Sequence, residues 1–157
     1  MGCRLKKHFV ETYRASKTFK APLDFVFRWC TDFREDDWKM TGSKVRRTFL
    51  ERTDRRVVWA VEYKEEGKNV EGIRVVWLHP PNSWSLDTCG DYRELGEYNL
   101  KPKGKNKTRL DMTFRLSFES KDDVEDRKEW EKRLLKDWGI FARFLENDYR
   151  TSLLEAK

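Results

Sequence analysis

The stretch from Ser120 to Leu154, SKDDVEDRKEWEKRLLKDWGIFARFLENDYRTSLL, decides the fold of this chain. Its large apolar residues recur at steps of three and four, which places them on one face of a helix. They are Trp130, Leu134, Trp138, Phe141, Leu145 and Tyr149. Ser120 is a suitable N-cap and Asp123 follows it at capping-box spacing, so we predict one long helix that begins at Ser120. The apolar face of this helix must pack against residues 1–119.

Residues 1–119 are predicted to form mainly strands. We expect a strand over Phe9–Lys20, followed by helices over Leu23–Thr31 and Glu35–Met40. Six strands separated by turn residues then follow, over Val45–Arg52, Val57–Lys64, Val70–Leu78, Trp84–Thr88, Arg93–Leu100 and Thr108–Phe118. Connections this short make neighbouring strands antiparallel, because a parallel pair needs a crossover of about a dozen residues. The predicted fold class is α+β: a curved antiparallel sheet of about seven strands wrapped on a long C-terminal helix, in the order β-α-α-β6-α.

Alternation along the strands predicts which side chains face the core. In the last strand one face carries Leu110, Met112, Phe114, Leu116 and Phe118. The same parity places an inward row on each of two other strands, Val57, Trp59, Val61 and Tyr63, and Gly96, Tyr98 and Leu100. The strand Val70–Leu78 is apolar on both faces, so its orientation stays open.

Length and composition limit the class of protein. A chain of 157 residues is the size of one domain, and we expect a single domain over residues 1–157. Charged residues make up 39% of the chain, and no apolar run approaches the roughly 20 residues that span a bilayer. The three cysteines are widely spaced and form no CxxC pair, so neither a disulfide framework nor a zinc site is predicted. We expect a cytoplasmic protein with no metal and no cofactor.

The segment Lys17–Phe27, KTFKAPLDFVF, carries a resemblance to a known family, together with Thr31-Asp32-Phe33 and Trp38. This pattern resembles that of the START and birch-pollen-allergen superfamily, also called SRPBCC. It consists of a strand, Ala-Pro, an acidic residue, Val followed by an aromatic residue, and a later Asp and Trp. The resemblance covers the chain from Phe9 to Leu154. It implies a helix-grip fold with a cavity between sheet and terminal helix for a lipid, sterol, polyketide, quinone or similar ligand. It transfers no catalytic residue to this sequence, because the motif is structural.

Seven Trp, ten Phe and five Tyr are many for this length, and such rings either fill a core or line a cavity. The predicted ligand-binding residues combine inward strand positions with the helix face: Arg47, Trp59, Tyr63, Trp84, Tyr98, Phe114, Trp138, Phe141 and Leu145. Arg47 beside inward apolar positions could hold a carboxylate or an enolate, and Asp87 joins the candidates if its strand faces the other way. No catalytic residue is assigned.

Three functions remain open from the sequence. The first is carrying or sequestering a hydrophobic or aromatic small molecule or lipid, and the alternative is a polyketide cyclase/dehydrase-like enzyme that uses the same cavity. A cavity with buried Arg, Asp or Tyr favours the enzyme, and an all-apolar one favours the carrier. The third is a basic interaction domain with a filled core that docks on nucleic acid or an anionic membrane, which the net charge of +6 would favour.

The basic turn around Gly104 gives that third function its candidate surface. An anionic membrane could be contacted through Lys101, Lys103, Lys105 and Lys107. Nucleic acid is not expected as a partner, because no aromatic residue lies near this turn for stacking on bases. The oligomeric state stays open.

Overall fold

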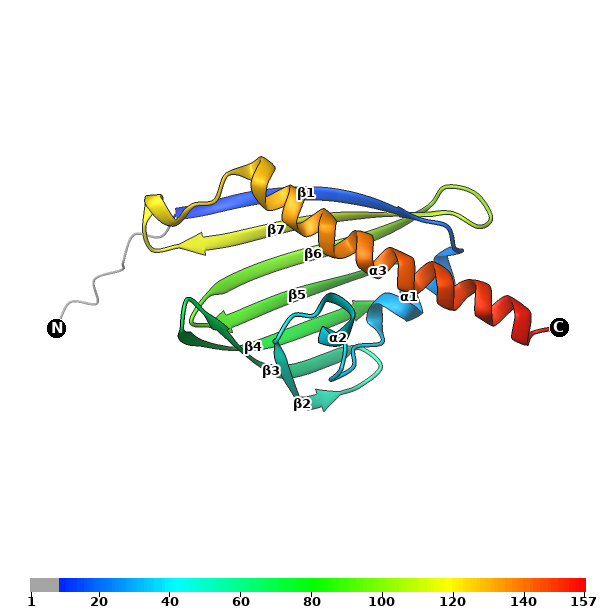
Figure 1. Ribbon diagram of the computed structural model, residues 1–157, viewed down its shortest axis with the longest axis horizontal. Helices are drawn as coiled ribbons and strands as arrows, with labels where there is room; N and C mark the ends of the chain where they lie inside the picture. The colour runs from blue at the N-terminus through cyan, green and yellow to red at the C-terminus, as the bar shows by residue number, and fades with distance from the viewer. Residues whose placement is uncertain (1–8) are drawn as a thin grey trace.

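A computed structural model describes residues 9–157, and the N-terminal residues up to His8 lie outside the described part (Figure 1). The strands are β1 (Phe9–Phe19), β2 (Arg46–Arg52), β3 (Arg56–Glu65), β4 (Lys68–His79), β5 (Ser83–Gly90), β6 (Arg93–Pro102) and β7 (Thr108–Phe118). The helices are α1 (Leu23–Thr31), α2 (Trp38–Thr41), the 3-10 helix η1 (Lys121–Asp123) and α3 (Arg127–Glu155). The predicted order of elements is confirmed.

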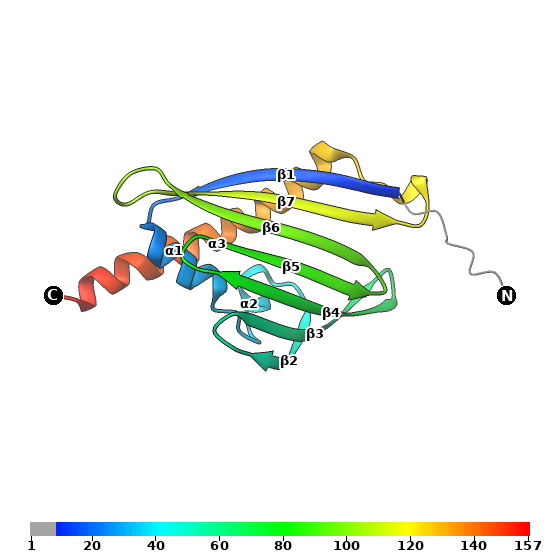
Figure 2. The same cartoon turned by 180° about the vertical axis from the view of Figure 1, so that it is seen from behind.

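The strands form one curved sheet in the order β1-β7-β6-β5-β4-β3-β2, and every neighbouring pair is antiparallel. All three α-helices lie on the same face of this sheet, with α3 running across it (Figure 1). The view from behind shows the opposite face without a helix (Figure 2). The predicted α+β architecture, with a long helix on one face of a curved sheet, is therefore confirmed.

The inward parity predicted for β3, β6 and β7 is also confirmed, since Trp59, Leu100 and Met112 are each 1% exposed. The structure settles β4, whose even-numbered residues face the helices: Val76 is fully buried, while Trp77 on the other face is 43% exposed. Its inward row therefore includes a charged residue, Arg74, where the sequence left the orientation open.

Strand β5 also has a defined orientation. Trp84, Leu86 and Thr88 face inward, so Asp87 lies on the outer face of the sheet. There its Oδ2 accepts a hydrogen bond from Arg93 Nη2 at 3.1 Å. Asp87 is therefore not a cavity residue.

The long helix begins later than predicted. Ser120 Oγ accepts a hydrogen bond from Asp122 N at 3.2 Å and caps only η1. The chain is extended at Val124, and the carboxylate of Asp126 then caps α3 by accepting from Lys128 N at 3.1 Å and Glu129 N at 3.2 Å. These extended residues redirect the chain from the end of β7 onto the sheet, so a continuous helix from Ser120 does not form.

The second short helix also differs from the prediction of Glu35–Met40. The carboxylate of Asp37 accepts a hydrogen bond from Arg34 N at 3.1 Å, which holds residues 34–37 as a turn. Helical geometry starts only at Trp38, and Gly42, with φ of +72°, ends α2 after one turn.

The core is filled where α3 begins. Tyr13 of β1 stacks on Trp130 of α3, with ring centroids 4.5 Å apart, and Phe114 of β7 meets the same indole edge-on at 5.2 Å. Farther along the helix, Leu145 is fully buried. The part of the concave face formed by β2–β5 lies beneath α1, α2 and their connecting loop instead (Figure 1). A cavity remains there.

Candidate functional site

The cavity has a volume of about 340 Å³ and lies between the concave face of the sheet, α1, α2, the connecting loop and α3. Eight aromatic residues line it: Trp29, Phe33, Trp38, Trp59, Trp84, Tyr98, Trp138 and Phe141. Six charged residues join them: Asp32, Arg34, Asp37, Arg47, Arg74 and Asp137. The volume falls near the lower end of the ~300–1,000 Å³ typical of small-molecule sites.

Strands β5 and β6 provide one aromatic wall. Trp84 and Tyr98 are directly paired in the sheet, and their rings stack with centroids 4.9 Å apart and planes at 11°. Trp138 of α3 approaches Tyr98 at 6.1 Å and Phe141 at 5.3 Å. Burial raises the pKa of the Tyr98 hydroxyl well above its ordinary value, so this phenol stays neutral near pH 7.

Trp59 of β3 forms the opposite wall together with groups from β2 and the loop. Phe33 and Phe49 lie 5.0 and 5.7 Å from its ring, and the guanidinium carbon of Arg47 lies 4.9 Å from the ring centroid. Its indole nitrogen is buried and has no hydrogen-bond partner among residues 9–157. The ring therefore acts through its faces, by aromatic packing and a cation–π contact.

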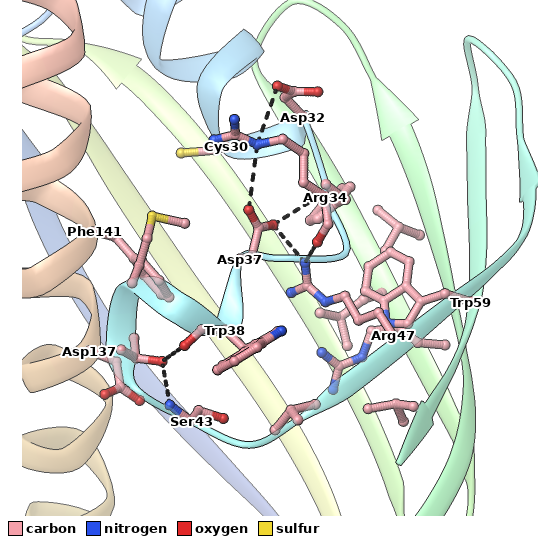
Figure 3. Close-up of a pocket in the computed structure, with 18 of the residues that line it drawn as sticks. Cys30, Asp32, Arg34, Asp37, Trp38, Ser43, Arg47, Trp59, Asp137 and Phe141 are labelled. Carbon is pink, nitrogen blue, oxygen red and sulfur yellow. Dashed lines mark hydrogen bonds and ion pairs between the residues drawn. The ribbon is translucent and has the colours of Figure 1, made fainter. Parts of the chain in front are cut away.

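Arg47 bridges strand β2 and the loop that covers the cavity (Figure 3). Its Nη1 lies 2.6 Å from Asp37 Oδ2 and donates a second hydrogen bond to the main-chain oxygen of Arg34 at 3.1 Å. The side chains of Arg47 and Asp37 are only 22% and 17% exposed. Burial lowers the pKa of Arg47, and the adjacent carboxylate of Asp37 counteracts this effect. The cavity thus contains a half-buried ion pair.

Arg74 is another of the arginines that line the cavity. Its Nε donates to Thr88 Oγ1 at 2.7 Å, and its Nη2 lies 3.6 Å from Glu94 Oε2. All three residues face the concave side of the sheet, where Thr88 is fully buried. Sequence reasoning missed Arg74 because β4 is apolar on both faces. The available signal was a single arginine between Ile73 and Val75.

The structure brings six of the predicted ligand-binding residues together around the cavity: Arg47, Trp59, Trp84, Tyr98, Trp138 and Phe141. That they bind a ligand stays a prediction. Tyr63 does not line the cavity, and packs instead on Tyr92 at 6.2 Å. Phe114 fills the core between Tyr98 and Trp130, and Leu145 is fully buried. These three residues are not part of the candidate site.

The residues that sequence reasoning missed lie mainly in α1, α2 and the loop between them. Trp29, Phe33 and Asp37 all reach the cavity from this segment. The loop alternates neither at the period of a helix nor at that of a strand, so its pattern does not predict an inward face. Cys30 also lines the cavity, and burial raises the pKa of its thiol, so it does not supply a thiolate near neutral pH.

Residues 9–157 contain neither a metal-binding cluster nor a membrane-spanning helix. In this part of the chain no three His, Cys, Asp or Glu side chains are grouped so that they could hold a metal ion. No helix in it is both long and apolar enough to cross a membrane.

A curved antiparallel sheet closed around a long C-terminal helix, with a cavity between them, defines the helix-grip fold. Comparison of the sequence with protein-family models found no match, and comparison with curated proteins found none. The structure does resemble solved structures. A START superfamily protein from Mycobacterium smegmatis superimposes with a TM-score of 0.62 and 15% identity, over 89% of this chain and 97% of that one.

Two other solved structures match over similar lengths. The Zhui aromatase/cyclase from Streptomyces sp. R1128 gives a TM-score of 0.67 and 13% identity, over 92% of this chain and 96% of that one. Ara h 8.0201 superimposes with a TM-score of 0.68 and 11% sequence identity, over 87% of this chain and 98% of that one. The chain therefore has the START-like, or SRPBCC, fold that its sequence predicts.

Proposed function

We propose that this protein binds a compact, ring-containing hydrophobic molecule in the cavity between its sheet and α3. The observation that carries the proposal is a cavity of about 340 Å³ lined by eight aromatic residues. A concave site of this size, lined mainly by aromatic side chains with a few polar groups, is typical of sites that bind small molecules. The START-like fold agrees with this proposal, because the family resemblance implies a cavity for a hydrophobic ligand.

The two walls of the cavity indicate which chemical groups a ligand should carry. The stacked pair of Trp84 and Tyr98 offers flat apolar surface, which suits a planar ring system. The guanidinium of Arg47 at the other wall suits an oxygen of a carboxylate, carbonyl or enolate. The volume is small for a long-chain lipid, so a molecule of a few fused rings with one oxygen-bearing end fits best.

A polyketide cyclase/dehydrase-like activity is the second candidate. It is favoured by the presence of Arg47, Asp37 and Tyr98 in the cavity, because polar groups held in an apolar site suit acid–base and oxyanion chemistry. The fold shared with the Zhui aromatase/cyclase supports it further. In that reaction Arg47 would stabilise a developing enolate oxygen.

Native mass spectrometry tests the binding function. The full chain, purified from a lipid-containing host, is compared with Trp138→Ala, which opens the aromatic wall, and with Trp77→Ala, a matched change on the outer face. We expect a bound apolar compound in the parent and in Trp77→Ala and none in Trp138→Ala, with circular dichroism showing that all three fold. A clean apo mass, with no response of tryptophan fluorescence to naphthalene, 2-naphthoate or fatty acids, would contradict the proposal.

The same sample separates carrier from enzyme. An intact compound recovered from the protein after prolonged incubation supports carrying. Conversion of the bound compound with loss of water, reduced far more than binding in Arg47→Leu, supports the cyclase/dehydrase-like activity.

A further inference from the structure

The turn between β6 and β7 concentrates positive charge at one end of the molecule. Residues 101–109 contain five cations and no carboxylate, against a formal charge of +6 for the whole chain. Lys101 and Arg109 both approach Asp111, at 3.5 and 2.8 Å. Among residues 9–157, no ion pair involves the exposed residues Lys103, Lys105 and Lys107. The tip of the turn is therefore positively charged without local compensation.

This turn has a defined conformation. Lys103 N donates to the main-chain oxygen of Lys107 at 2.8 Å, and Gly104 adopts a φ of +130° that suits glycine. At its base the fully buried Thr108 donates from Oγ1 to the main-chain oxygen of Ala21 at 2.8 Å. The turn thus presents its lysines at a fixed place beside the β1–α1 connection.

Two exposed leucines lie near the end of α3, at the same end of the molecule as this charge (Figure 1). Tyr149 of α3 contacts the turn through its hydroxyl, which lies 3.4 Å from Asn106 Oδ1. Leu153 follows four residues later on the same helix face and is 49% exposed, and Leu154 is 71% exposed. The turn and the end of α3 both project at the end of the molecule opposite β1's first residues (Figures 1 and 2).

We propose that this end of the molecule docks on an anionic phospholipid membrane. Lys103, Lys105 and Lys107 would contact headgroup phosphates and carboxylates, while Leu153 and Leu154 enter the boundary with the acyl chains. A nucleic-acid strand fits less well, because the turn has no aromatic side chain for stacking and a phosphate backbone offers no apolar surface to the leucines. The proposal does not depend on what the cavity binds.

Vesicle sedimentation with the full chain tests the charge. The vesicles are phosphatidylcholine alone or phosphatidylcholine with about one-third phosphatidylserine. The variant Lys105→Glu/Lys107→Glu is compared with Lys64→Glu/Lys68→Glu, which changes the net charge equally on exposed residues at the β3–β4 turn, the opposite end of the sheet. We expect binding that requires phosphatidylserine and that weakens about tenfold or more in the first variant alone.

The leucines are tested separately with Leu153→Ser/Leu154→Ser, and circular dichroism verifies that each variant folds. We expect this variant to bind the anionic vesicles more weakly than the parent, and unchanged binding would overturn the proposed insertion. Three results would overturn the docking surface: no binding that depends on phosphatidylserine, equal loss in the Lys64/Lys68 control, or binding of duplex DNA in place of vesicles.

Discussion

Arg47 Nη1 lies 2.6 Å from Asp37 Oδ2, and this ion pair joins the edge strand of the sheet to the loop that covers the cavity. The same guanidinium lies over the indole ring of Trp59. A second arginine of β2, Arg52, donates to the main-chain oxygen of Phe33 in the same loop. The cover of the cavity is therefore held on the sheet by polar contacts, whereas the beginning of α3 is held by aromatic packing.

Removing the carboxylate of this pair should destabilise the fold. Asp37→Ala leaves the half-buried Arg47 without its counter-charge, and we expect a loss of about 1–3 kcal/mol after allowing for partial solvent screening. Asp32→Ala is the control, because Asp32 and Arg34 are 3.9 Å apart and more than half exposed. Urea unfolding measures both. Equal, small changes in the two variants would show that the pair does not stabilise the loop.

The start of α3 gives a second prediction. Asp126→Ala removes an N-cap that accepts hydrogen bonds from Lys128 N and Glu129 N, and should cost about 1 kcal/mol. Ser120→Ala affects only the cap of η1 and should cost less. The free energies of unfolding of the two variants provide the comparison. A larger loss at Ser120 would place the effective helix start where the sequence pattern puts it.

Two glycines should respond oppositely to the same change. At Gly139 of α3 an added Cβ meets no atom within 4 Å, so Gly139→Ala should stabilise the helix by about 1 kcal/mol. At Gly96 of β6 a Cβ would lie 2.9 Å from Leu86 Cγ and 3.1 Å from Phe114 Cε1, so Gly96→Ala should destabilise by about 1–3 kcal/mol. Thermal unfolding midpoints test this. A lower unfolding midpoint in both variants would indicate that α3 cannot accept a side chain at residue 139.

High pH should weaken the fold through Tyr63. Burial chiefly, with nearby negative charge, raises the pKa of Tyr63 to about 12, while the pKa of a tyrosine in the unfolded chain is about 10. Between these values the folded state binds more protons than the unfolded state, so the free energy of unfolding falls as pH rises from about 10 to about 12. Phenolate absorbance follows the titration. Tyr63→Phe should remove a step at high pH from the phenolate titration curve. An unchanged titration curve would contradict the raised pKa of Tyr63.

Short connections and alternation were enough to predict much of this molecule. The turn at Gly67 and the next at Pro81 leave no room for a crossover, so antiparallel pairing follows directly. Strand parity and helix periodicity are local properties of the chain, so they can be read from the sequence. They correctly place three aromatic residues of the cavity lining on the inner side: Trp59, Tyr98 and Trp138. These two periodicities thus locate much of the aromatic lining.

Other features depended on contacts that no local pattern contains. The start of α3 is set by Asp126 and by Tyr13, whose hydroxyl donates to the main-chain oxygen of Glu125 at 2.9 Å from the far edge strand. Tyr63 has the inward parity of Trp59 but lies beyond the cavity, because α2 and its loop cover only part of β3. Strand parity therefore predicts on which face of the sheet a side chain lies, but not which side chains from other elements surround it.

The sequence by itself determined the class of fold, the pairing of the strands and the apolar face of the last helix, because each follows from residue periodicity and connection length. Only the tertiary structure decided that Arg74 faces inward and that the loop carrying Phe33 and Asp37 closes over Trp59 and Arg47. The physical reason is that the loop is placed by an ion pair and ring contacts between segments that are distant in sequence, and the space left beneath it is a property of their packing.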